Sequence, residues 1–261
     1  MTFERRATTE GGFVLVSTPL EGDGFLAAFS ERTGGVSGAP YDSLNLSFVV
    51  GDDDERVRAN RARLTGALGI ERFATAQQVH GDRVVRVGAK RAGAGFDDPE
   101  DRIPDADAMV TTSGAVALGV LTADCVPVVA ASAAEGRIAI AHAGWRGLAA
   151  GIVGAIAGLF ERGDEVRVAL GPAIGPDHYE VGEDVALAVA AGTQAGAVTE
   201  RRNGTTRLDL TGTIRTELRA LGIRRVDDTG LCTACESARF FSFRRDEVTG
   251  RQAGVAVKLS A

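Results

Sequence analysis

The residues best suited to chemistry are two histidines and one cysteine, each in a short motif. His80 lies in QVHG, Cys125 in TADCVP and His142 in HAGWRG. Two imidazoles and a thiol can bind a transition metal or support a cysteine nucleophile. The chain has only three histidines, so imidazole chemistry has almost no alternative residues to use. The motifs therefore predict one site, formed by His80, Cys125 and His142.

Two chemistries fit this set. Two histidines and a cysteine leave one coordination position open, as in catalytic zinc sites with three protein ligands and a water. Zinc would lower the pKa of that water towards about 7. Without a metal, the Cys125 thiolate would attack a carbonyl while an imidazole carries the proton. Asp124 is either a hydrogen-bond partner of an imidazole or a turn residue.

Copper is less favoured than zinc. A blue-copper site uses two histidines and a cysteine with a weak axial methionine. The chain has only two methionines, Met1 and Met109, and its pattern is not that of an all-β electron carrier. A multicopper oxidase needs far more imidazoles than the three present.

Several arginines could bind an anion. Arg32, in the glycine turn ERTGGVS, is suited to a bidentate grip. Arg146 stands where a helix is expected to begin, a favourable place for an anion. Arg61 and the aromatic, arginine-rich segment Phe240–Asp246 are further candidates. For each single arginine, a surface ion pair or a packed side chain is the alternative.

The other cysteines are less informative. Cys232 and Cys235 form a Cys-x-x-Cys pair without a second pair, so we interpret them as structural, and His178 as a loop residue. Three cysteines, an odd number, favour a reducing compartment. No segment resembles a signal peptide or approaches the ~20 apolar residues of a membrane span. We expect a cytoplasmic protein without a membrane partner.

The elements that must position these residues follow from the apolar pattern. The expected strands are Phe13–Ser17, Leu26–Ser30, Arg83–Val87, Ala108–Thr112, Val116–Leu121, Val126–Ala130, Arg137–Ala143, Val166–Leu170 and Gly254–Lys258. The expected helices are Asp53–Leu68, Leu148–Arg162, Gly182–Ala191 and Thr211–Leu221, and the expected loops are Ala89–Asp105 and Thr193–Thr206.

This inventory predicts an α/β fold, a single domain over residues 1–261 with one mixed β-sheet flanked by helices. Cys125 then lies at a strand boundary and His142 at a strand end, where α/β proteins place their chemistry. The net charge of −6, without a basic stripe, argues against a nucleic-acid partner.

The chain resembles a known family. The motifs GGVS, SLNL, VGDD, NR, QVHG, TADC and HAGWRG, together with Leu170–Gly175 and Phe240–Asp246, are similar to those of the bacterial multicopper polyphenol oxidase-like proteins. This family is also called the laccase-domain, peptidoglycan editing factor or purine nucleoside phosphorylase family. The resemblance runs in order from about residue 28 to residue 256.

The resemblance implies a fold similar to the catalytic domain of cytotoxic necrotising factor toxins. It implies zinc bound by His80, Cys125 and His142, and phosphorolysis of adenosine, inosine and methylthioadenosine, with adenosine deamination as a second reaction. Arg61 matches an arginine associated with activity, so we expect it to be catalytic. Arg32 and Arg146, with Asn45 of the SLNL motif, are the expected cofactor-binding residues.

Three functions remain open from the sequence. The first is a zinc-dependent purine nucleoside phosphorylase and adenosine deaminase, whose partners are a nucleoside and phosphate. The second, also implied by the resemblance, is a cysteine or zinc amide hydrolase that removes serine from a peptidoglycan precursor. The third is a nucleoside-binding or metal-binding module without turnover.

Overall fold

The computed structural model describes residues 2–259 and contains two six-stranded sheets and one three-stranded sheet. The first sheet has the order β1 (Phe3–Ala7), β2 (Phe13–Ser17), β3 (Phe25–Ser30), β15 (Gln252–Lys258), β7 (Ala117–Thr122) and β4 (Phe73–Ala74). The second has the order β14 (Arg225–Asp228), β10 (Arg167–Leu170), β8 (Val126–Ser132), β9 (Arg137–Ala143), β6 (Ala108–Thr111) and β5 (Val84–Arg86). The small third sheet has the order β11 (Glu180–Val181), β13 (Thr205–Leu208) and β12 (Thr199–Arg202).

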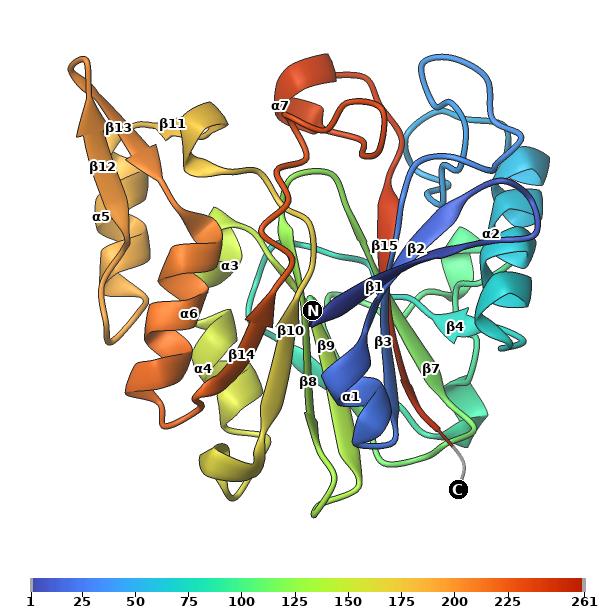
Figure 1. Cartoon of the computed structure of the whole chain (residues 1–261), viewed down its shortest axis with the longest axis horizontal. Coiled ribbons are helices and arrows are strands. Elements are labelled where there is room, and N and C mark those ends of the chain that lie inside the picture. Colours follow the sequence, from blue (N-terminus) through green and yellow to red (C-terminus); the bar gives the residue numbers. More distant parts are fainter. Residues whose placement is uncertain (1, 260–261) are drawn as a thin grey trace.

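The helices are α1 (Thr18–Gly22), α2 (Asp54–Leu68), α3 (Trp145–Ala150), α4 (Ile152–Ala157), α5 (Glu183–Ala191), α6 (Leu210–Ala220) and α7 (Phe243–Asp246). In Figure 1, α2 lies on the outer side of the first sheet, and α3, α4 and α6 lie on the outer side of the second. The short α1 instead contacts β2, β3 and β10, strands of both sheets, and the short α7 lies at the top of the view. Four short 3₁₀ turns, at Ala89–Arg91, Pro99–Asp101, Gly163–Glu165 and Pro176–His178, complete the inventory within residues 2–259.

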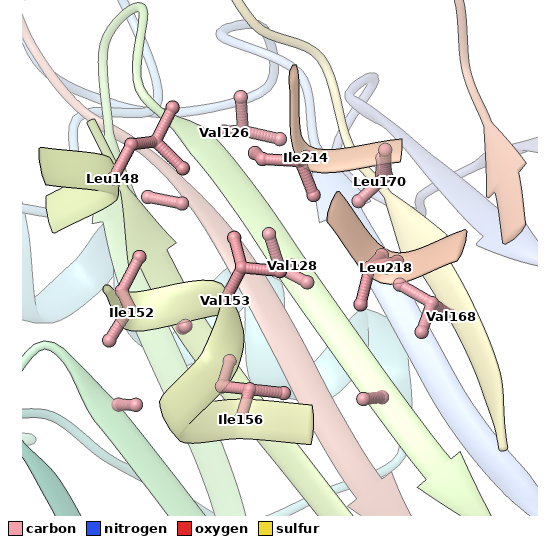
Figure 2. Close-up of a cluster of buried hydrophobic side chains, with 14 of the residues drawn as sticks. Val126, Val128, Leu148, Ile152, Val153, Ile156, Val168, Leu170, Ile214 and Leu218 are labelled. Atoms are coloured by element: carbon pink, nitrogen blue, oxygen red, sulfur yellow. The ribbon is translucent and has the colours of Figure 1, made fainter. Parts of the chain in front are cut away.

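The core is built in layers. Between the two sheets, Phe29 and Val120 of the first sheet share one cluster with Val129 and Ile140 of the second. On the outer face of the second sheet, Val126 and Val128 of β8 and Val168 and Leu170 of β10 pack against α3, α4 and α6 (Figure 2). On the outer face of the first sheet, Leu64 of α2 packs into a third cluster. The arrangement is helix, sheet, sheet, helix.

The mixed α/β class is confirmed, but the expectation of one sheet is wrong. Both large sheets are mixed, because β4 and β7, β5 and β6, and β10 and β14 pair in parallel while the other neighbours are antiparallel. β3 and β8 are buried along their whole length. A strand buried on both faces fits either a sheet between two helical layers or a sheet stacked on another, so the sequence pattern does not separate the two.

Helix boundaries follow the capping chemistry. Asp53 caps α2 by accepting hydrogen bonds from the N–H groups of Glu55 and Arg56, and Gly69 ends the helix in the left-handed conformation. The predicted helix Leu148–Arg162 is instead two helices that start earlier, at Trp145. Gly151, with φ of 94°, separates them, since a left-handed residue cannot continue an α-helix.

The predicted loop Thr193–Thr206 is also partly wrong. β12 and the start of β13 form a hairpin there, joined at Asn203 and Gly204, which both have positive φ. An Asn-Gly pair with positive φ is the typical signal of a tight hairpin turn, but β12 is exposed and polar, so no alternation of apolar residues accompanies it. None of the helices within residues 2–259 is long and apolar enough to cross a membrane.

Candidate active site

His80, Cys125 and His142 come together as predicted. Cys125 directly precedes β8, and His142 lies in β9, where it pairs with Pro127 in the antiparallel register. His80 arrives from the segment between β4 and β5, and its ring lies 4.7 Å from that of His142. The ligand atoms of the three side chains all lie within 4.8 Å of one another. A single ion can therefore contact all three.

Asp107, which the sequence reasoning missed, holds both histidines in place. Its Oδ1 lies 2.9 Å from Nδ1 of His142. Its Oδ2 accepts hydrogen bonds from the backbone N–H groups of Val79, at 3.0 Å, and Gly81, at 2.7 Å, on either side of His80. Because Nδ1 of His142 is occupied, its Nε2 is left for the cluster. The only available signal was an acidic residue at the head of a predicted buried strand.

The backbone around the cluster is unusual. His80 has φ of 62° and Asp124 has φ of 96°, a left-handed region that non-glycine residues rarely adopt. Such conformations persist when surrounding contacts fix them, and they gather at functional sites. Gly144 is a further constraint, because a Cβ there would lie 2.7 Å from Sγ of Cys125. The space beside the thiol thus depends on a glycine.

Of the two alternatives for Asp124, the structure favours the turn residue over the imidazole partner. Its Oδ1 accepts a 2.6 Å hydrogen bond from the hydroxyl of Thr233, and its Oδ2 accepts one of 2.7 Å from the backbone N–H of Arg244. Its carbonyl accepts a hydrogen bond from the N–H of Ile174. These three bonds hold the strained residue before Cys125 and so set the direction of the thiol.

Cys125 and His142 form a thiolate–imidazolium pair in the metal-free protein. Burial by itself raises the pKa of the Cys125 thiol, but the charge and hydrogen bond of His142 and a hydrogen bond from His80 outweigh it and lower the pKa to about 6. Burial lowers the pKa of His142, but the Cys125 thiolate and the Asp107 carboxylate outweigh burial and raise it to about 9. The thiolate is the form of cysteine that binds metal or attacks carbon.

A cavity of about 550 Å³ opens onto the cluster. Its wall carries an arginine cluster made of Arg61, Arg102, Arg146, Arg244 and Arg251. Within residues 2–259, none of these arginines forms an ion pair with a carboxylate. The only carboxylate in the wall is that of Asp124, which is already hydrogen-bonded on both oxygens. The cavity is therefore a strongly positive site suited to an anion.

Arg61 is the most deeply buried of these arginines, at 1% exposure. Its guanidinium donates to the carbonyl oxygens of Leu46, Gly95 and Phe96 and stacks over the ring of Phe48. Burial, together with the charge of Arg102, lowers its pKa to about 9. With a pKa of about 9, the guanidinium of Arg61 remains charged at neutral pH, and no carboxylate within residues 2–259 forms an ion pair with it.

Of the other predicted binding residues, one lines the cavity and two do not. Arg146 lines the cavity, exposed and stacked on Trp145. Arg32 and Asn45, which the sequence also predicts to bind a ligand, do not line this cavity. Arg32 donates to the carbonyl oxygens of Asp42 and Ser237.

Asn45 is fully buried, and its side chain forms hydrogen bonds to neighbouring loop segments. Its amide donates to the carbonyl of Ser47 and to Asp52, and its Oδ1 accepts from the backbone N–H of Arg251. Through Asn45, the SLNL motif thus holds the backbone of Arg251, whose side chain lines the cavity. His178 is also more than a loop residue, because its Nε2 lies 3.2 Å from Sγ of Cys235.

The family model described as multi-copper polyphenol oxidoreductase laccase matches residues 26–258. The chain belongs to this family. It is 41% identical over 233 residues to purine nucleoside phosphorylase PA4543 of Pseudomonas aeruginosa, covering 88% of this chain and 91% of that protein. It is 42% identical over 232 residues to purine nucleoside phosphorylase SCO2081 of Streptomyces coelicolor, covering 87% of this chain and 92% of that protein.

Solved structures of the family share the fold. The crystal structure of YlmD from Geobacillus stearothermophilus matches with a TM-score of 0.93 at 32% identity, covering 99% of both chains. The Neisseria meningitidis protein NMB0706 matches with a TM-score of 0.80 at 34% identity, covering 100% of both chains. Family and fold therefore agree, and the relatives' names indicate an enzyme that processes nucleosides.

Proposed function

We propose that this protein is a zinc-dependent purine nucleoside phosphorylase that also deaminates adenosine. The observation that carries the proposal is the arginine cluster without carboxylate partners, in the same cavity as His80, Cys125 and His142. Phosphorolysis needs a phosphate anion beside a neutral nucleoside, and this cavity offers guanidinium groups and aromatic rings together. The relatives named purine nucleoside phosphorylase support the same reaction.

The three proposed ligands fit zinc. One thiolate and two imidazoles within 4.8 Å of one another are donors that zinc prefers, and Asp107 orients the His142 ring as partners of zinc ligands commonly do. When bound, zinc supplies a strong electrophile and makes hydroxide accessible near neutral pH. Gly144 keeps the volume beside Cys125 free of a side chain.

In the proposed phosphorolysis, guanidinium groups place phosphate against the ribose. A phosphate oxygen forms a bond to C1′ of the ribose, and the bond from C1′ to N9 of the purine breaks. The electron pair of the broken bond stays on the purine, which then takes a proton from solvent. Arg61 and Arg146 hold the phosphate in line, and the positive cavity stabilises the negative charge that develops on the base.

In the proposed complex, aromatic rings in the cavity wall bind the purine base. Phe48, Trp145, Tyr179 and Phe243 all line the cavity, and flat rings bind a purine by stacking. Deamination of adenosine to inosine and ammonia needs a water at C6 of the purine, whereas phosphorolysis acts at C1′ of the ribose. We therefore propose two binding poses, in which either the base or the ribose faces the cluster.

The test is to incubate the purified protein with adenosine and phosphate. We expect ribose 1-phosphate and free base, and inosine that disappears when the metal is removed. Arg146→Ala should raise the KM for phosphate by about ten- to hundredfold, because a charge-assisted contact is lost. Arg219→Ala, on the exposed side of α6, is the matched control and should change nothing. Absence of both products would reject the proposal.

One observation favours a second candidate, the amide hydrolase that removes serine from a peptidoglycan precursor. The thiolate–imidazolium pair of Cys125 and His142, backed by Asp107, resembles the nucleophile, base and orienting group of cysteine hydrolases. This candidate predicts serine release from a serine-containing muramyl substrate, lost in Cys125→Ala. Activity that survives complete zinc removal would identify Cys125 as the nucleophile.

We also propose a cytoplasmic location. Cys125, Cys232 and Cys235 are all free thiols, which fits a reducing compartment. A nucleoside and phosphate are both small molecules that this compartment supplies. Labelling of intact cells with a thiol reagent that cannot cross membranes should therefore leave all three unmodified.

A further inference from the structure

A second group of metal-binding side chains lies outside the candidate active site. His178 ends the 3₁₀ turn Pro176–His178, and Cys232 and Cys235 lie in the segment before α7. The ligand atoms of the three residues all lie within 4.8 Å of one another, and Nε2 of His178 is 3.2 Å from Sγ of Cys235. The proposed reactions use none of these side chains.

The geometry suits a tetrahedral ion. Bond lengths of about 2.3 Å to sulfur and about 2.0 Å to nitrogen place neighbouring zinc ligands roughly 3.5 Å apart, close to the spacing of His178 and Cys235. A spacing of two residues between cysteines is common in zinc sites. Two thiolates with an imidazole select zinc over magnesium or calcium, which prefer oxygen.

A backbone donor holds the sulfur of Cys232 in place. The backbone N–H of Gly175 donates a 3.2 Å hydrogen bond to Sγ of Cys232. Hydrogen bonds of this kind fix the orientation of metal-binding side chains in proteins. A Cβ at Gly175 would approach that sulfur to 3.3 Å, so the glycine permits the close approach of the two segments.

We propose that His178, Cys232 and Cys235 form a second zinc site, distinct from the one at His80, Cys125 and His142. His178 and Cys235 are exposed, so solvent fills the fourth position. The site joins the segment after β10 to the segment before α7, which contact each other through the bridge between Ala173 and Cys232.

Zinc at this place would fix part of the active-site wall. Tyr179 follows His178 and lines the cavity. Thr233 follows Cys232 and donates the 2.6 Å hydrogen bond to Asp124, the residue before Cys125. The proposed zinc is therefore a positioning element, since it holds two segments whose next residues shape the cavity and the direction of the thiol.

The experiment uses Cys125→Ala protein, which retains Cys232 and Cys235 as its only thiols. Metal-free protein is titrated with Zn²⁺ under reducing conditions, and thiol reactivity and thermal unfolding are followed. We expect binding of about one equivalent of zinc, shielding of both thiols until a chelator is added, and a higher melting temperature. The same protein with Cys232→Ser and Cys235→Ser is the control and should bind none.

A second variant is needed because the control with both serine substitutions could lose zinc binding by failing to fold. His178→Ala, at an exposed position, should weaken zinc binding while leaving both thiols present and countable. Two thiols that stay reactive in the presence of Zn²⁺ would overturn the proposal. The proposal would also be overturned if the reduced protein binds no zinc and Cys232 and Cys235 form a disulfide in air. The outcome is independent of the proposed function, because Cys125→Ala lacks a ligand of the first site.

Discussion

At the scale of single residues, Asp107 organises the candidate site. Its two carboxylate oxygens contact Nδ1 of His142 and the backbone on both sides of His80. Burial raises the pKa of Asp107, but hydrogen bonds from His142 and Gly81 outweigh burial and lower it. The carboxylate therefore stays ionised and stabilises the imidazolium of His142, which in turn stabilises the Cys125 thiolate.

This chain of charges predicts the pH dependence of Cys125 in the metal-free protein. The pKa of the thiol is lowered from 9.0 to about 6, so its reactive form is lost only as the pH falls through about 6. The rate of iodoacetamide labelling, read by mass spectrometry of the Cys125 peptide, should be half-maximal near pH 6. Asp107→Asn should move this midpoint upwards, because neutral Asn lowers the pKa of His142 and weakens the pair.

The same pKa shifts predict how the free energy of unfolding depends on pH. The pKa of Cys125 is lowered, so its contribution to the free energy of unfolding is lost as the pH falls through about 6. The pKa of His142 is raised, so its contribution is lost as the pH rises through about 9. A labelling midpoint near that of an ordinary thiol, unchanged in Asp107→Asn, would contradict this account.

Gly144 supports a second prediction at this scale. In Gly144→Ala the new methyl group would lie 2.7 Å from Sγ of Cys125, so the thiol must move. We expect zinc affinity to fall by about ten- to hundredfold, as when residues that orient metal ligands are changed. Gly154→Ala in α4 is the matched control, since nothing lies within 4 Å of its Cβ and alanine favours a helix. Equal zinc affinity in both variants would reject the prediction.

The sequence predicted residues with rare chemistry better than residues with common chemistry. His80, Cys125 and His142 were identifiable because histidine is scarce and their motifs are distinctive. Arginine is abundant, so nothing local separated Arg102, Arg244 and Arg251, which line the cavity, from Arg32, which does not. Their roles depend on which way each side chain faces, and that is set by tertiary packing.

At the scale of elements, the strained turn before β8 is held by the segment before α7. The hydroxyl of Thr233 donates to Asp124, and Arg245 in turn donates to the carbonyl oxygens of Thr233 and Ala234. Residues far apart in the sequence thereby fix the backbone next to Cys125.

Thr233→Val tests this connection, because valine keeps the shape and removes the hydrogen bond. The lost bond leaves Oδ1 of Asp124 without its donor, which should lower the free energy of unfolding by about 1–3 kcal/mol and slow Cys125 labelling. Thr199→Val, on the exposed strand β12, is the control and should be neutral. Denaturant unfolding and labelling rates provide the measurements. Identical behaviour of the two variants would refute the connection.

Elements with buried apolar faces were predictable, and polar ones were not. The expected ranges closely match β2, β8, β9 and α2, because apolar runs and caps define them. β1 and β12 alternate weakly or not at all, and β14 presents mostly polar residues, so only pairing with neighbours makes them strands. The break at Gly151 was visible as a glycine but not as a left-handed one.

At the scale of the whole molecule, the charge of the cavity opposes that of the protein. The chain carries a net charge of −6, yet its cavity wall holds five arginines without ion-pair partners within residues 2–259. The stacking of two sheets was the feature of the fold that the sequence could not specify, because the strand pattern is the same for one covered sheet or two stacked ones.

This charge arrangement predicts how salt affects catalysis. Screening over a Debye length of about 10 Å at 0.1 M weakens attraction of an anion into the cavity. Added KCl should therefore raise the KM for phosphate more than the KM for the neutral nucleoside, in steady-state kinetics at constant pH. The same change in both constants would show that the arginines do not attract the anion. Arg146→Ala should reduce the salt effect, and Arg219→Ala should not.

The β8–β9 hairpin also gives the chain a reporter of its own folding. Cys125 directly precedes β8 and His142 lies near the end of β9, and the two strands are joined by the short turn at residues 133–136. The two side chains therefore meet through local contacts, which close quickly. His80 comes from a distant segment, and the N–H groups of Val79 and Gly81 on either side of it donate to Asp107. Because the hairpin contacts are local and the contact with His80 is not, the reactivity of the Cys125 thiol during refolding should report the hairpin first and the arrival of His80 second.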